Sequence, residues 1–277
     1  MTDYSRRYSK RASLAAMGVQ MRKWKIWQTV EEHVHIQQKV IRYRPLDKLL
    51  DAFINILAGG QGLVETNKKV RADPALQRAF GREGCAEQST ISDTVNAAVE
   101  ENVAEMRQAV TEVYRLHGQG YHHPYQTYLQ LLDVDMSGLP AGRTGEGVEK
   151  GFFSGKRNCR GRQLGRVVAT HYREVVVDRL YPGKRQMERS LQELVTSAEE
   201  ALVLDESRRK RTIVRVDGGG GRDADVNWLL EQGYHAVLKN KNWKRANKLA
   251  ASVSEWHVDP KTGDREVGWV ERPHSYL

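Results

Sequence analysis

The feature that most constrains the fold is the stretch LLDVDMSGLP, residues 131–140, in which two aspartates stand one residue apart inside an apolar run. The apolar positions predict a buried strand, and successive side chains of a strand point to opposite faces. Asp133, Asp135 and Ser137 therefore share one face, with about 6.6 Å between alternate residues. Carboxylates on such a strand are costly unless a positive group lies against them. We therefore expect a cation beside this face.

A second strand that ends in an aspartate is predicted by RTIVRVD, residues 211–217. Ile213, Arg215 and Asp217 share a face, and Asp217 falls where GGGG stops the strand. Hard cations such as Mg²⁺ prefer carboxylate oxygens, and two ions about 3.5–4 Å apart can clamp the attacking and leaving oxygens of a phosphodiester. Asp135 and Asp217 are thus a candidate metal pair from separate strands. The alternative is that each aspartate caps a turn or pairs with a nearby arginine.

Hydrophobic spacing divides the chain into a helical first part and a mixed second part. Apolar residues recur by threes and fours over 44–57 and 89–116, which predicts helices there. The stretch HGQGYHHPYQ, residues 117–126, breaks the pattern and predicts a domain boundary. Strands and helices alternate after it, and the end of the chain predicts a hairpin with the turn DPKTGD. This order is typical of a mixed α/β domain from about residue 127 onward.

The charge balance points to a polyanionic partner. The chain of 277 residues has 44 Lys+Arg against 35 Asp+Glu, a net charge of +9. Such a balance favours nucleic acid, with an anionic membrane surface as the weaker alternative. Cys85 and Cys159 have no close cysteine partner, so they predict neither a disulfide framework nor a zinc site, and a reducing cytosol is expected. No apolar run approaches the roughly 20 residues of a membrane span.

Two segments are candidates for DNA contact. A basic tract follows the first aspartates, and its cations can grip a phosphate backbone: Arg143, Lys150, Lys156, Arg157, Arg160, Arg162 and Arg166. A solvated basic loop is the alternative. The stretch CAEQSTISDTVNAA, residues 85–98, is compatible with the second half of a helix-turn-helix whose Ser89, Thr90 and Ser92 face phosphates or bases. A capped bundle helix has the same pattern.

Two other motifs do not support a site. Gly218 to Gly221 are followed by Arg222-Asp223, which satisfies neither the Walker nor the dinucleotide pattern. The histidines 117, 122 and 123 lack a companion cysteine or carboxylate at a zinc spacing, so a solvated linker is the favoured interpretation.

Several segments resemble bacterial insertion-sequence transposases of the DDE type, whose catalytic core is ribonuclease-H-like. LLDVDMSGLP resembles the first catalytic strand, KGFFSGKRNCRGRQLGRV the segment after it, and VRVDGGGGRDADVNWLLEQGYHAVLKN the second-aspartate strand with its helix. LAGGQGLVETNKKVRADPALQRAFGREGCAEQSTISDTV resembles the helical DNA-binding region of the same group. The resemblance implies that Asp135 and Asp217 are catalytic and hold Mg²⁺ or Mn²⁺. It implies nicking of double-stranded DNA at element ends, then attack of the 3′-hydroxyl on target DNA.

One departure from the family concerns a third carboxylate, a glutamate on a later helix. Glu266 and Glu271 lie in the predicted hairpin instead, so we expect a C-terminally truncated transposase, with a non-catalytic DNA-binding protein that competes for element ends as the alternative. A homodimer on paired ends and a cytoplasmic, nucleoid-associated location in a bacterium are further expectations. The expected architecture is a basic segment at 1–44, a helical DNA-binding domain at 45–120, an incomplete ribonuclease-H-like core with a mixed sheet and flanking helices at 127–251, and the start of a β-rich insertion at 252–277.

Overall fold

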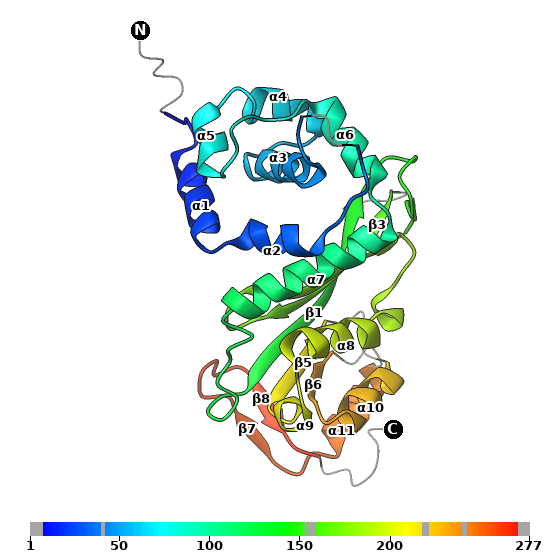
Figure 1. Cartoon of the computed structure of the whole chain (residues 1–277). Helices are drawn as coiled ribbons and strands as arrows, with labels where there is room; N and C mark the ends of the chain where they lie inside the picture. The colour runs from blue at the N-terminus through cyan, green and yellow to red at the C-terminus, as the bar shows by residue number, and fades with distance from the viewer. Residues whose placement is uncertain are drawn as a thin grey trace. The chain divides into compact units, whose positions relative to one another are not determined.

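The computed structural model describes residues 8–39, 42–151, 153, 159–217, 222–239 and 243–270. It divides into two compact units, Met1–His117 and Gly118–Leu277 (Figure 1). The boundary falls at the start of the HGQGYHHPYQ stretch, where the sequence predicts a change of domain. No described helix combines the length and the apolar character that crossing a membrane requires.

The described residues of the first unit form helices and no strand. The elements are α1 (Ala12–Lys23), α2 (Ile26–His33), α3 (Pro45–Leu57), the 3-10 turn η2 (Leu63–Glu65), α4 (Thr66–Lys69), α5 (Pro74–Ala79), α6 (Gln88–Ala97) and α7 (Glu100–His117).

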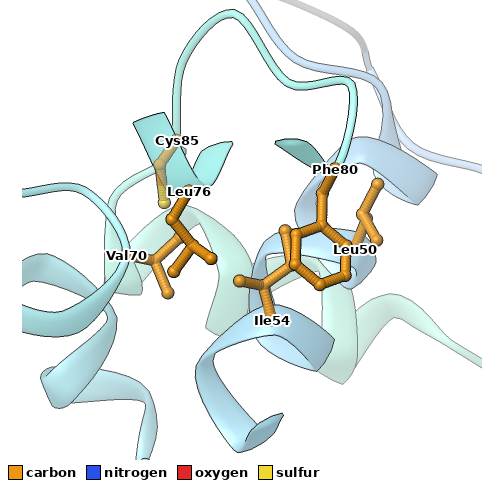
Figure 2. Close-up of a cluster of buried hydrophobic side chains, with 6 residues drawn as sticks. All are labelled: Leu50, Ile54, Val70, Leu76, Phe80 and Cys85. Atoms are coloured by element: carbon orange, nitrogen blue, oxygen red, sulfur yellow. The ribbon is translucent and has the colours of Figure 1, made fainter. Parts of the chain in front are cut away.

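One core cluster of this unit gathers around α3, whose apolar residues recur at helical spacing. Leu50 and Ile54 of α3 pack with a set from the following helices and loops, as Figure 2 shows: Val70, Leu76, Phe80 and Cys85. Gly18 of α1 lies so close to Phe80 that a Cβ atom built there would come within 2.5 Å of its ring. The helix α1 therefore packs tightly against this core because it has a glycine at the contact.

The N-terminal segment is part of this helical unit. We expected residues 1–44 to form a separate basic segment, but α1 packs on α5 and α2 packs on α7. Val30 and Val34 contribute to a second core cluster with Ala109 of α7. Burial of these apolar side chains ties the segment to the unit.

A buried ion pair holds the chain just before α6. Asp51 of α3 is fully buried, and Arg82 Nε donates to its Oδ1 at 2.9 Å. The backbone N–H of Ala86 donates to the same carboxylate at 2.8 Å. Burial raises the pKa of Asp51, and the hydrogen bonds from Arg82 and Ala86 oppose that rise. The pair thereby fixes the loop between α5 and α6 onto α3.

The helix predicted over 89–116 is two helices in the structure. The chain breaks at Ala98, which has extended backbone angles, and α7 begins at Glu100. Asn102 Oδ1 accepts from the N–H of Val99, and its Nδ2 donates to the carbonyl of His35. An asparagine that caps a helix start and also binds a neighbouring extended segment explains the break, which periodicity alone did not reveal.

The second unit is a mixed α/β domain, as expected. Its strands are β1 (Gln130–Pro140), β2 (Glu149–Lys150), β3 (Arg160–Ala169), β4 (Glu174–Pro182), β5 (Thr212–Val216), β6 (His235–Leu238), β7 (Trp256–Val258) and β8 (Glu266–Gly268). Its helical elements are the 3-10 turn η3 (Met187–Arg189), α8 (Leu191–Leu202), α9 (Glu206–Arg209), α10 (Asp223–Glu231) and α11 (Trp243–Ala251).

The main sheet combines an antiparallel half with a parallel half. Strands β2, β3, β1, β5 and β6 follow one another in this order, and β4 also pairs with β3. The pairs β1–β3 and β3–β4 are antiparallel, whereas β1–β5 and β5–β6 are parallel. The strands β7 and β8 form a separate antiparallel hairpin at the end predicted from the sequence.

One face of the sheet is buried under α8. Leu132, Val134, Val167, Val214 and Val216 lie on this face, and α8 covers it with a stripe of buried residues, Leu191, Leu194, Val195 and Ala198. Gly165 permits the close approach, since a Cβ there would meet Leu194 Cδ1 at 2.8 Å. The opposite face carries the aspartates, and side chains on it such as Val237 remain about half exposed.

Candidate functional site

Asp135 lies on the exposed face of β1, at the point where this strand runs on beyond β5. Its neighbour on the same face is Ser137, whose Oγ donates to Asp135 Oδ2 at 3.3 Å. The alternation of side chains predicted for this stretch is therefore observed, with Leu132 and Val134 buried on the other face. Asp135 is exposed to solvent and accessible to a ligand.

Asp217 reaches the same edge of the sheet from β5. Val134 of β1 pairs with Val216 of β5 in a parallel register, and each aspartate is the next residue of its strand. Neighbouring strands lie about 4.8 Å apart, so the two carboxylates arise from adjacent backbone positions. The carboxyl ends of parallel strands are the usual place for ligand binding in open α/β sheets.

The two aspartates line one cleft of about 620 Å³. Side chains on the same face of the sheet that line it with them include Asp133, Arg215, Val237 and Lys239. Leu238 of β6 pairs with Val216 of β5 in a parallel register. Lys239 and Asp217 are the next residues of the two chains, so they lie side by side. The cleft thus combines three acidic side chains, Asp133, Asp135 and Asp217, with two basic ones, Arg215 and Lys239.

The positive group expected beside the aspartates is Arg215. Asp133 and Arg215 are register partners across β1 and β5, and the guanidinium Nε and Nη2 both donate to the Asp133 carboxylate. Hydrogen bonding to Asp133 raises the pKa of Arg215. The expected cation is therefore present, and it pairs with Asp133. The sequence pattern places Arg215 on the face of Asp217, but it does not connect Arg215 to Asp133, because local pattern does not contain the strand register.

A second arginine lies on the other side of Asp135. The antiparallel register pairs Asp135 with Arg166 of β3, and Arg166 in turn with Asp178 of β4. Paired residues of antiparallel strands share a face, and opposite charges in such pairs attract. Asp135 is therefore flanked by a cation on β3 and by Asp217 on β5.

The donor set suits a magnesium ion that is shared with a phosphate. Mg²⁺ is commonly held by one or two carboxylates, with waters and substrate phosphates at its remaining positions. Asp135 and Asp217 supply two carboxylates, whereas the side chain of Asp133 is held by Arg215. Among the described residues, no group of three or more histidine, cysteine or acidic side chains could hold a metal ion. Glu266 is on β8, and Glu271 lies outside the described residues.

Most described residues of the basic tract after β1 lie on strands of the main sheet. Arg160, Arg162 and Arg166 all belong to β3. Arg143 is in the turn after β1, and Lys150 is on β2 beside Arg160. Lys156 and Arg157 lie outside the described residues.

The candidate DNA-reading residues of the first unit lie at the start of α6. Ser89 and Thr90 are exposed, and Ser92 is half-buried. Thr90 Oγ1 donates to the carbonyl of Glu87 at 2.9 Å, so this hydroxyl is engaged in the first turn of the helix. The loop between the short helix α5 and α6 spans residues 80–87, which is longer than the three- or four-residue turn of a typical helix-turn-helix. The DNA-reading role and the capped bundle helix both stay predictions.

The interpretation of His123 as part of a solvated linker is wrong. Its ring is buried, with Nδ1 2.8 Å from the Tyr172 hydroxyl and Nε2 3.2 Å from the Tyr128 carbonyl. Burial lowers its pKa. The segment is anchored because Glu174 accepts from the backbone N–H groups of Gln119 and Gly120.

Two solved structures of low sequence identity are similar to the chain. No protein-family model matches the chain, and no curated protein matches it in sequence. A piggyBac transposase synaptic complex with hairpin DNA is similar with a TM-score of 0.42 and 13% identity, over 86% of this chain and 56% of that one. A pre-cleavage Mos1 transpososome is similar with a TM-score of 0.27 and 11% identity, over 74% of this chain and 62% of that one. The chain thus spans less than two thirds of either neighbour, and similarity at this level assigns it to no family.

Proposed function

We propose that the chain is a DNA transposase of the DDE type with a ribonuclease-H-like core, in which Asp135 and Asp217 are the catalytic metal ligands. The observation that carries the proposal is the convergence of these two aspartates, 82 residues apart in sequence, at one edge of adjacent parallel strands. Both residues occupy the positions that the motif resemblance selects. The partner is double-stranded DNA, in keeping with the net charge of +9.

In such a site, different side chains of the cleft would bind the metal ion and the DNA backbone. Asp135 and Asp217 would hold Mg²⁺ or Mn²⁺ against a DNA phosphate. A bound divalent ion supplies a nucleophile at neutral pH and stabilises the charge that develops at phosphorus. Arg166 and Lys239 stand at the two sides of the aspartate pair and are available to attract the DNA backbone. Asp133 is withheld from the ion by Arg215.

The finer parts of the proposal follow the motif resemblance. They are an origin in a bacterial insertion sequence, action as a homodimer on paired element ends, and a cytoplasmic site of action at the nucleoid. A second function is favoured by one observation: among the described residues, no group of three or more histidine, cysteine or acidic side chains is placed to hold a metal ion. In that case the chain binds DNA without cutting it and competes for element ends.

The test is a strand-cleavage assay on DNA with candidate element ends, in the presence of Mg²⁺ or Mn²⁺. Asp135→Ala and Asp217→Ala should each lower cleavage at least about 100-fold, since a metal ion contributes several kcal/mol to charge stabilisation. Asp264→Ala is the matched control, because Asp264 is an exposed aspartate in the turn between β7 and β8, outside the main sheet. Binding without cleavage by the unaltered chain supports the second function instead.

A further inference from the structure

Three arginines form a row on the sheet face that carries the aspartates. Arg160, Arg162 and Arg166 are separated by two and four residues along β3, with Leu164 between the last two, and the pairing with β1 is regular from Gly161 to Ala169. Since side chains two, four or six residues apart share a face, all three point to the same side as Asp135. The row begins beside the aspartate, because Arg166 is the register partner of Asp135.

The row ends at a basic pocket. A hollow of about 710 Å³ lies where β1 ends and β3 begins, and Arg143, Lys150 and Arg160 line it together with Cys159. None of the described residues that line it is acidic. The cations of the pocket therefore continue the row of β3 arginines, and no carboxylate among these lining residues neutralises them.

The length of the row matches a stretch of DNA backbone. Six residues separate Arg166 from Arg160, which is about 20 Å along a strand. The phosphates of one DNA strand advance about 3.4 Å along the duplex axis, so the row covers roughly six of them. On the other side of Asp135, the guanidinium of Arg215 is already neutralised by Asp133.

We propose that one strand of the DNA substrate lies along β3, from the aspartate pair toward the pocket at Arg143, with its phosphates neutralised by Arg166, Arg162 and Arg160. The proposal rests on the proposed function in taking DNA as the substrate, and it adds the direction in which the DNA leaves the site. The β3 arginines act by binding and positioning, and none of them is a metal ligand.

The experiment measures how the affinity for a fluorescein-labelled 30-base-pair duplex depends on salt, by anisotropy in buffer with EDTA. The full chain is compared with the triple variant Arg160→Ala/Arg162→Ala/Arg166→Ala. Each phosphate contact contributes about 0.9 to the slope of log K against log salt, so the slope should fall in magnitude by about 2.7. Lys210→Ala is the control, since Lys210 is an exposed cation just before β5, at the opposite end of that strand from Asp217.

A replacement by three lysines at the same positions should restore most of the slope, because charge rather than shape sets this quantity. If the triple alanine variant does not fold, Arg166→Ala alone serves, since this side chain is exposed, and its slope should fall by about 0.9. A slope equal to that of the unaltered chain overturns the proposal. The binding assay contains EDTA, so its result does not depend on catalysis. If the triple variant loses slope but the unaltered chain does not cleave DNA in the metal-dependent assay, the catalytic function alone is rejected. If the unaltered chain cleaves DNA but the slope of the triple variant is unchanged, the β3 path alone is rejected.

Discussion

Arg215 on β5 donates two hydrogen bonds to the carboxylate of Asp133 on β1, and the two residues are partners in the parallel register of these strands. The pair neutralises the one aspartate of the DVD stretch that is not proposed as a metal ligand. It also joins the strand β1, which carries Asp135, to the strand β5, which Asp217 directly follows. The geometry of the candidate site is therefore coupled to an ion pair within the same sheet face.

The Asp133–Arg215 pair should contribute modestly to stability. We expect a coupling free energy of about 0.5–1 kcal/mol in a double-mutant cycle of Asp133→Ala and Arg215→Ala, because both side chains keep contact with solvent. Urea unfolding of the four proteins measures it. High salt should shrink the coupling, and strictly additive effects would contradict the pairing.

Removal of Arg215 should also tighten metal binding at the aspartates. A unit charge about 7 Å from a divalent ion changes the energy of that ion by about 1.2 kcal/mol in a water-like medium, so Arg215→Ala should lower the Kd for Mn²⁺ about sevenfold. Electron paramagnetic resonance of free Mn²⁺ gives this Kd directly. Lys210→Ala should leave it unchanged, and equal affinities in all three proteins would show that Arg215 does not restrain the site.

Breaking the buried pair of Asp51 and Arg82 should lower the free energy of unfolding much more than breaking the Asp133–Arg215 pair. Arg82→Met leaves the fully buried Asp51 without its guanidinium, and breaking such a pair typically costs about 3–5 kcal/mol. The matched control is Arg71→Met, since Arg71 pairs with Glu87 on the surface and should cost about 1 kcal/mol or less. Urea unfolding compares the two variants, and similar losses would refute a special role for the buried pair.

The two cysteines should differ in reactivity. Burial is the main reason that the pKa of Cys85 rises to about 12, so its thiol remains protonated at pH 8. Cys159 is only partly buried. A chromogenic disulfide reagent should therefore label one thiol per folded chain and two in urea. Cys159→Ser should abolish the first labelling, and rapid reaction of Cys85 in the folded chain would contradict its burial.

Stability should depend on the protonation of His123. Burial lowers the pKa of this histidine in the folded chain, so the unfolded chain takes up its proton at a higher pH. The contribution to stability is complete above the unfolded pKa of about 6.5 and is lost as the pH falls below it. Between pH 7.5 and 5.5 the unaltered chain should lose more free energy of unfolding than His123→Gln, which does not titrate. Equal losses would mean that His123 is not buried in its neutral form.

The local sequence pattern predicts the order of helices and strands in this protein and the faces on which key side chains lie. Alternation along LLDVDMSGLP put Asp135 and Ser137 on one face, and the position of Asp217 before a run of glycines put it at a strand end. The order of helices and strands indicated a helical unit followed by a mixed α/β unit. These features follow from the sequence because side-chain direction in a strand or helix depends only on near neighbours.

The tertiary structure decided which residues of distant segments lie next to one another. Pairing of β1 with β5 and β3 selected Arg215 as the partner of Asp133 and Arg166 as the neighbour of Asp135, and packing buried His123 and broke the helix at Ala98. Strand register and burial depend on contacts between residues that are far apart in the chain. No local periodicity encodes them, because they are fixed only when the sheet and the core assemble.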